Sequence, residues 1–279
     1  MNARAYAKIN VGLRILRKRE DGYHDIETIF HQVNLFDDLH FKLHEREVLL
    51  KTDNARLPSD ASNLCVKAAE LLRDVTGTAD GVEIYLKKRI PVGAGLGGGS
   101  SDASTTLKAL RRLWRLDITN DELHSLALSL GSDVPFFLNG GTAYALGRGE
   151  QLESMILSIP YWIVVVTPPV HVSTAWAYKN IKRAEAVLPI DLRAFLFEQM
   201  NQPARMIQAV VNDFEEVVFP AYPQIEHLKR TFQQAGAVFV LMSGSGSSVF
   251  GFFDDQAKVK RFTDQFGSDY VLSISEPSF

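Results

Sequence analysis

A glycine-rich segment between residues 91 and 101 is the part of the chain whose residue types point most directly to chemistry. It reads Pro-Val-Gly-Ala-Gly-Leu-Gly-Gly-Gly-Ser-Ser and leads into a helical pattern that runs from Ser101 to Trp114. Glycine lets the backbone adopt positive φ and approach a ligand without a Cβ in the way. The start of a helix adds unpaired N–H groups and the positive end of a dipole, which together suit phosphate. The segment therefore predicts a nucleotide-binding loop.

Other interpretations of this loop are open from the residues alone. Gly93, Gly95 and Gly98 satisfy G-x-G-x-x-G between a predicted strand and a predicted helix, a motif typical of dinucleotide oxidoreductases. The motif lies far into the chain, however, and Asp117, near the position of the expected acidic residue, falls between two predicted helices. No Gly-Lys-Ser/Thr sequence occurs, which excludes a Walker A loop, and the partner motifs of protein kinases are missing. A tight turn that binds nothing is the remaining alternative, although consecutive glycines would weaken it.

The composition is that of an ordinary globular protein. With 279 residues, 46% of them hydrophobic and 23% charged, the chain can form one large or two modest cores. A net charge of −3 gives no general attraction to nucleic acid or anionic membranes. The single Cys65 excludes an internal disulfide, and the longest apolar run, residues 161–166, is too short to span a bilayer. We expect a cytoplasmic monomer or weak homodimer without nucleic-acid or membrane partners.

Hydrophobic periodicity predicts the elements that position the loop. In the N-terminal part it predicts strands at 3–16, 26–36, 39–44, 48–51 and 82–86, a helix capped by Ser62, the helix from Ser101 and a helix that starts in a Thr119–Glu122 capping box. A glycine-rich hairpin is expected at 139–149. The C-terminal part reads as strands at 161–166 and 270–273, a strand pair across Gly244 and Gly246, and helices at 173–180, 192–200, 204–214, 222–234 and 255–266. This mixed order is consistent with an α+β sandwich, and we place a domain boundary near residue 150.

Segments spread over almost the whole chain resemble the GHMP kinases, small-molecule kinases named for galactose, homoserine, mevalonate and phosphomevalonate. The glycine loop is similar to their phosphate loop, and the similarity extends to residues 7–10, 21–24, 131–137 and 242–246. The triple glycine and Asp-Gly-Tyr-His are the most specific segments, and they resemble the members that act on a cytidine diphosphate-linked methylerythritol.

The resemblance implies a two-domain α+β fold. Residues 1–150 would form an N-terminal domain like domain 2 of ribosomal protein S5, and residues 151–279 a ferredoxin-like α/β sandwich that contributes to the substrate cleft. It also implies an enzyme that uses ATP and Mg²⁺ to phosphorylate the 2-hydroxyl of that substrate in the non-mevalonate route to isoprenoid precursors.

Two residues gain catalytic roles from the resemblance. From the residues alone, Asp133 is either a turn former or a buried base, and Lys8 is a solvated strand lysine. The resemblance makes Asp133 the general base for the substrate hydroxyl and Lys8 its partner, which holds the substrate oxygen and offsets charge in the transition state.

The ATP site follows from the loop and from the resemblance. Backbone N–H groups between residues 95 and 101 would cradle the phosphates. Ser100 and Ser101 are equally suited to cap the helix or to ligate phosphate or Mg²⁺, and Ser101 is the candidate metal ligand. The full expected set is Pro91, Val92, Gly93, Ala94, Gly95, Leu96, Gly97, Gly98, Gly99, Ser100 and Ser101, with Asn63 and Lys88 beside the adenine or ribose.

The resemblance also implies a substrate site. Tyr23 and His24 would bind the cytosine ring, Tyr178 would supply a second aromatic ring, and Asn10 would bond the erythritol hydroxyls. Rim packing is the alternative for the aromatic residues. Gly244 and Gly246 either let their loop approach the active site or form a simple bend. The rival functions are a sister kinase acting on homoserine or mevalonate, a non-catalytic nucleotide sensor and a nicotinamide oxidoreductase.

Overall fold

The structure is a computed structural model that describes residues 1–181 and 186–278. The chain forms two compact units, each assembled from separate segments. The first unit comprises Met1–Ala7, Leu35–Val92 and Gly97–Gly140, and the second comprises Lys8–Asn34, Gly93–Leu96 and Gly141–Phe279. The long strands β1 (Asn2–Lys18) and β2 (His24–His44) contribute residues to both units. A division of the chain at residue 150 stays a prediction.

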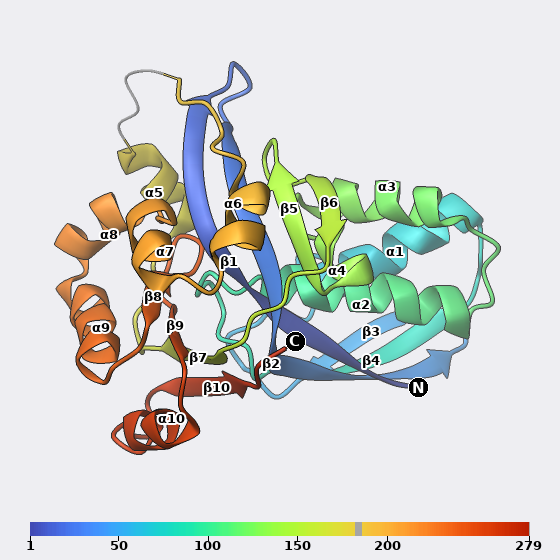
Figure 1. Ribbon diagram of the computed structural model, residues 1–279. Helices are drawn as coiled ribbons and strands as arrows, with labels where there is room; N and C mark the ends of the chain where they lie inside the picture. Colours follow the sequence, from blue (N-terminus) through green and yellow to red (C-terminus); the bar gives the residue numbers. More distant parts are fainter. Residues whose placement is uncertain (182–185, 279) are drawn as a thin grey trace. The chain divides into compact units, whose positions relative to one another are not determined.

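In the first unit, helices cover one face of a small sheet. β4 (Gly81–Lys87) pairs in parallel with β3 (Val48–Thr52) and antiparallel with the second half of β2. Alternate residues of these strands, such as Phe41 and Ile84, enter a core shared with the helices. Those helices are α1 (Leu64–Thr76), α2 (Gly98–Leu113) and α3 (Asn120–Leu130), and the short α4 (Phe136–Asn139) follows them in the chain. Figure 1 shows α1 and α2 side by side.

The second unit contains two groups of strands. The first half of β2 pairs with β5 (Thr142–Leu146), which forms a hairpin with β6 (Gln151–Met155). A separate antiparallel sheet has the order β10-β7-β9-β8. Its strands are β7 (Trp162–Thr167), β8 (Phe239–Met242), β9 (Val249–Phe253) and β10 (Val271–Ser275).

Six helices accompany the strands in the described residues of the second unit. They are α5 (Thr174–Asn180), α6 (Leu192–Gln199), α7 (Pro203–Ala209), α8 (Glu215–Ala221), α9 (Pro223–Gln234) and α10 (Gln256–Thr263). α9 shows why they pack: Ile225, Leu228 and Phe232 repeat at helical spacing and are buried in one core cluster with strands β8 and β9. No helix in the described part of the chain combines the length and apolarity needed to cross a bilayer.

The structure confirms the α+β class and most predicted elements, including the capping box of Thr119 and Glu122. Three local predictions were wrong for identifiable reasons. β2 continues through Asp37, whose carboxylate is buried and bonded. Asn63 rather than Ser62 caps α1, because its side chain accepts the N–H of Cys65. The helix predicted over 204–214 is interrupted around Asn212, whose side chain bonds the backbone of three other residues.

Candidate active site

The N-terminus of α2 is built for an anion. Gly97 takes a left-handed conformation (φ 69°) as its N-cap, so the helix starts at Gly98, three residues before the predicted start. Among the described residues no side chain caps this end, in contrast to α1 and α3, and no acidic residue lies in its first turn. Because the first N–H groups of a helix have no intrahelical partner, the amides of Gly98, Gly99 and Ser100 remain for a ligand. Ser100 and Ser101 lie inside the helix and do not cap it, so of the two roles left open by the sequence only ligation of phosphate or Mg²⁺ stays a prediction.

The preceding part of the loop, in the second unit, packs against the segment around Gly244. The Ser243 hydroxyl donates to the Gly95 carbonyl at 2.9 Å. Gly95 has φ +78°, and a Cβ there would overlap the carbonyl oxygen of Ser243. Gly244 has φ +55°, and its Cβ would lie 3.1 Å from the Cα of Gly95. Both positions therefore require glycine, and Gly244 allows a close approach of its backbone to that of Gly95; the approach of this loop to an active site stays a prediction.

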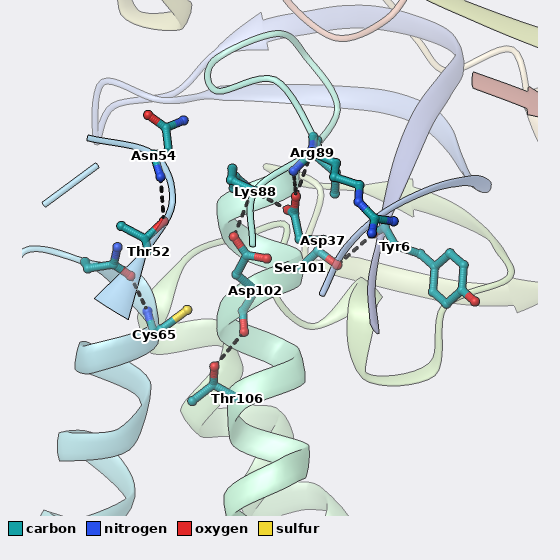
Figure 2. A network of polar contacts seen from close by, with 12 residues as sticks. Tyr6, Asp37, Thr52, Asn54, Cys65, Lys88, Arg89, Ser101, Asp102 and Thr106 are labelled. Carbon is teal, nitrogen blue, oxygen red and sulfur yellow. Dashed lines mark hydrogen bonds and ion pairs between the residues drawn. The ribbon is translucent and has the colours of Figure 1, made fainter. Parts of the chain in front are cut away.

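Three buried ionisable residues, here called the buried triad, lie beside the start of α2 in the first unit. Lys88 donates to Asp37 and, at 2.8 Å, to Asp102 in the first turns of α2 (Figure 2). All three side chains are nearly inaccessible to solvent. Burial would lower the pKa of Lys88, but attraction to Asp102 and Asp37 raises it above its ordinary value. Burial raises the pKa of Asp102, against the attraction of Lys88, to about 8. The triad joins β2, the residue that follows β4, and α2.

Two further residues of the expected ATP site have structural partners. The Ser101 hydroxyl is buried and donates to the backbone carbonyl of Tyr6 at 2.7 Å (Figure 2). Asn63 caps α1 and also donates to the carbonyl of Pro58 at 2.9 Å. Their contacts with ATP, like that of Lys88, stay predictions.

Ser101 is the candidate magnesium ligand. The described residues contain no cluster of three or more His, Cys, Asp or Glu that could hold a metal. Mg²⁺ usually keeps several waters and binds through substrate phosphates with one or two protein ligands. The Ser101 oxygen keeps lone pairs while its proton is donated to Tyr6, so its chemistry is compatible with one such ligand.

Lys8, in the second unit, is buried on β1 and held by polar and aromatic neighbours. Lys8 is only 4% exposed, which excludes the interpretation of this residue as a solvated strand lysine. Its Nζ donates to Asn10 Oδ1 at 2.6 Å and lies 4.6 Å from the centre of the Phe30 ring. The Asn10 amide group in turn donates to the Thr28 hydroxyl at 2.9 Å. A buried ammonium with fixed neighbours is suited to stabilise charge at one defined point.

Asp133, in the first unit, lies half-buried in the turn between α3 and α4. The turn is closed by the Val134 N–H, which donates to the Gly131 carbonyl at 3.1 Å. Lys108 of α2 donates to the carbonyls of Phe137 and Leu138 at 2.6 and 3.2 Å. The helix that begins at the glycine loop thus also holds the segment that follows Asp133.

Aromatic side chains of the second unit gather near the Asp-Gly-Tyr-His turn. The rings of His24 and Tyr178 stack with centres 5.1 Å apart, and Tyr178 meets Phe214 edge to face. Burial, and then the charge of Lys18, lowers the pKa of His24, which favours the neutral imidazole. Tyr23 is 57% exposed, with the Arg148 guanidinium 5.0 Å from its ring centre. The structure therefore brings together His24 and Tyr178, although they are far apart in the sequence.

Residue types alone gave no signal for several contacts within each of the two units. Asp37 and Asp102 are separated from Lys88 by 51 and 14 positions, and only the fold makes them neighbours. Thr28 and Lys108 belong to no motif. Their partners are chosen by strand pairing and helix packing, which the sequence pattern does not specify.

Comparison with known proteins gives the class first. A family model described as the GHMP kinases N terminal domain matches residues 63–141, and one described as GHMP kinases C terminal matches residues 191–272. A solved homoserine kinase from Cytophaga hutchinsonii, 20% identical with a TM-score of 0.69, shares the fold, covering 99% of this chain and 95% of that one.

The relatives then give the particular family. The chain is 44% identical to a 4-diphosphocytidyl-2-C-methyl-D-erythritol kinase of Prosthecochloris aestuarii, over 100% of this chain and 98% of the relative. One from Chlorobium phaeobacteroides is 42% identical with the same coverage. A crystal structure of 4-(cytidine 5'-diphospho)-2C-methyl-D-erythritol kinase is 34% identical, with a TM-score of 0.82 and 98% of each chain covered. The chain belongs to the 4-diphosphocytidyl-2-C-methyl-D-erythritol kinase family of GHMP kinases. Membership of this family excludes the alternative interpretation of the glycine loop as part of a nicotinamide oxidoreductase.

Proposed function

We propose that this protein transfers the terminal phosphoryl group of ATP to the 2-hydroxyl of 4-diphosphocytidyl-2-C-methyl-D-erythritol. The observation that carries the proposal is the 44% identity to a kinase with this substrate in its name, maintained over the entire chain. The uncapped start of α2 supports it, because phosphate needs free backbone donors and this helix offers three.

In the proposed reaction, Asp133 accepts the proton of the substrate hydroxyl as its oxygen attacks the γ-phosphorus. The bond from that phosphorus to the β–γ bridging oxygen breaks, and ADP leaves. Transfer is direct and in line, without a phosphoenzyme. Lys8 holds the attacking oxygen and offsets negative charge in the transition state. Mg²⁺, when bound, neutralises phosphate charge, with Ser101 as a candidate ligand.

The proposed substrate site uses the aromatic group of the second unit. Tyr23, His24 and Tyr178 provide aromatic faces and an imidazole for the cytosine ring, a combination that suits a nucleobase. Asn10 is the candidate partner of the erythritol hydroxyls, although its carbonyl oxygen already accepts from Lys8. The proposal also places the protein in the cytoplasm as a monomer or weak homodimer.

A substrate panel tests the activity. Purified protein is given ATP and Mg²⁺ with 4-diphosphocytidyl-2-C-methyl-D-erythritol, homoserine or mevalonate, and ADP release is followed. We expect turnover with the first compound alone. Turnover only with another acceptor would make the protein a sister kinase, and binding of ATP with no turnover on any acceptor would indicate a nucleotide sensor.

Two variants test the assigned roles. We expect Asp133→Asn and Lys8→Ala each to lower kcat at least about 100-fold, the scale of a lost general base or a lost charge-stabilising donor, while ATP binding is kept. Near-normal kcat in either purified variant would remove that residue from the mechanism.

A further inference from the structure

The structure contains a short chain of hydrogen bonds that starts at Lys8 and ends on the backbone of Gly12. Lys8 Nζ donates to Asn10 Oδ1 at 2.6 Å, and Asn10 Nδ2 donates to Thr28 Oγ1 at 2.9 Å. The Thr28 hydroxyl donates to the Gly12 carbonyl at 2.6 Å. Lys8, Asn10 and Thr28 are 4%, 1% and 0% exposed, so bulk water does not compete for these groups. All four residues lie on the paired strands β1 and β2 in the second unit.

The direction of every bond in this chain is fixed by its two ends. An ammonium can only donate, so the Asn10 carbonyl oxygen must face Lys8. A backbone carbonyl can only accept, so the single proton of the Thr28 hydroxyl is used on Gly12. Thr28 must therefore accept from Asn10, and this holds the NH₂ group of the amide on the side away from Lys8.

The end of the chain on Gly12 is itself fixed. Gly12 has φ +86°, and a Cβ there would lie 3.0 Å from Val210 and 3.1 Å from Leu192. Its carbonyl is thus held by a conformation and a packing that only glycine readily permits. The backbone of Asn10 is also held, because its N–H donates to the Ser243 hydroxyl at 3.3 Å. The same hydroxyl donates to the Gly95 carbonyl of the glycine loop.

We propose that Thr28 is a positioning residue for phosphoryl transfer: by accepting from Asn10 it fixes the orientation of that amide, and the amide oxygen fixes the Lys8 ammonium. This inference rests on the proposed catalytic role of Lys8. Without the hydroxyl, the Asn10 NH₂ group loses its acceptor in a buried place and the amide is free to rotate. The ammonium then loses its fixed bond to Asn10 at the point where charge develops, and small misplacements of catalytic groups cost large factors in rate.

Two pairs of variants isolate the hydroxyl. Thr28 and Thr28→Val have nearly the same shape, and so do Thr28→Ser and Thr28→Ala, so within each pair only the hydroxyl changes. We expect Thr28→Val to lower kcat about 10- to 100-fold with the KM for ATP changed less than about twofold, and Thr28→Ser to stay within about threefold of the parent kcat. Should Thr28→Val fail to fold, the comparison of Ser with Ala carries the same test.

Thr142→Val is the matched structural control. Thr142 is also a buried threonine of this sheet, and its hydroxyl bonds a side chain, His31 Nδ1, at 2.8 Å. Thr28→Val loses the two hydrogen bonds of its hydroxyl and Thr142→Val loses one, so each variant should lose about 1–3 kcal/mol of stability per bond. Only Thr28→Val should lose kcat, which separates positioning from general destabilisation.

A double-mutant cycle with Lys8→Ala decides whether Thr28 acts through Lys8. If it does, Thr28→Val adds no further loss of kcat once Lys8 is alanine, although its cost in stability remains. Unchanged kcat in Thr28→Val beside a strongly impaired Lys8→Ala would overturn this inference and leave the proposed role of Lys8 intact. If Thr28→Val lowers kcat by the same factor in the Lys8→Ala background as in the parent, the inference is also overturned. Normal turnover of Lys8→Ala itself would instead refute the role on which the inference rests.

Discussion

Replacing Gly99 by alanine separates folding from phosphate binding. Gly99 is exposed at the second position of α2, and a Cβ there would meet nothing closer than Leu64 at 3.5 Å. Alanine is the better helix former by about 0.5–1 kcal/mol, so the variant should be at least as stable as the parent. In a chain of this size that gain corresponds to a rise in Tm of about 1–4 °C.

The same methyl group should weaken ATP binding. The Cα–Cβ bonds of a helix tilt toward its N-terminus, so the methyl projects into the space in front of the free amides. Losing one charge-assisted bond from an amide to phosphate costs about 1.5–3 kcal/mol, or about 10- to 150-fold in ATP affinity. The assay is calorimetric titration of each variant with a non-hydrolysable ATP analogue, together with thermal unfolding in the absence of nucleotide.

Gly267→Ala is the control for this prediction. Gly267 has no positive φ, and nothing lies within 4 Å of a Cβ built there. The control should leave nucleotide affinity unchanged. A Gly99→Ala protein that is folded and binds the analogue with parent affinity would show that the phosphates do not sit on these amides.

Three further substitutions test the packing and electrostatics around the site. Placing alanine at a left-handed position costs about 1–2 kcal/mol. Gly95→Ala should lower the free energy of unfolding by more than this, because the new Cβ overlaps the Ser243 carbonyl. Parent stability in chemical denaturation would contradict the close approach of residues 95 and 243. Burial lowers the pKa of His31 to about 4, so its contribution to stability is complete above pH 6.5 and is lost as the pH falls toward 4. His31→Gln should remove a slope of up to about 1.4 kcal/mol per pH unit in that window, and an unchanged slope in denaturation curves would refute the assignment. The pKa of Asp102 is raised to about 8, so its contribution is complete below pH 4 and is lost as the pH rises to 8. Relative to the parent, Asp102→Asn should gain stability with rising pH between those values, and a constant difference would contradict a raised pKa.

The sequence could predict the loop, the fold class and the pattern of elements because these follow from local rules. A glycine-rich composition, a hydrophobic period and capping residues can each be recognised in a short segment of the sequence. The start of α2 was misplaced because Ser101 looks like a cap, whereas the structure uses Gly97 and leaves the amides free. The break assumed at Asp37 failed because its carboxylate finds Lys88 and the N–H groups of Arg89 and Ile90 within the fold.

The partners inside the site could not be predicted, because they depend on which strands and helices become neighbours. Lysine is an ordinary surface residue type, and no residue near Lys88 in the sequence indicates that its side chain binds two buried carboxylates. Likewise, the link from Lys8 through Asn10 to Thr28 exists only because β1 pairs with β2. Family resemblance predicted Tyr178 as a second aromatic ring for the cytosine; the structure stacks its ring on His24, and its contact with the base stays a prediction.

The most direct test of the account is the product of the reaction. Purified protein is incubated with ATP, Mg²⁺ and 4-diphosphocytidyl-2-C-methyl-D-erythritol, and phosphorus NMR follows the mixture. We expect one new phosphomonoester signal, from phosphate on the 2-hydroxyl, formed in equal amount with ADP. ADP formed at the same rate without the acceptor, or a phosphate attached at another hydroxyl, would contradict it.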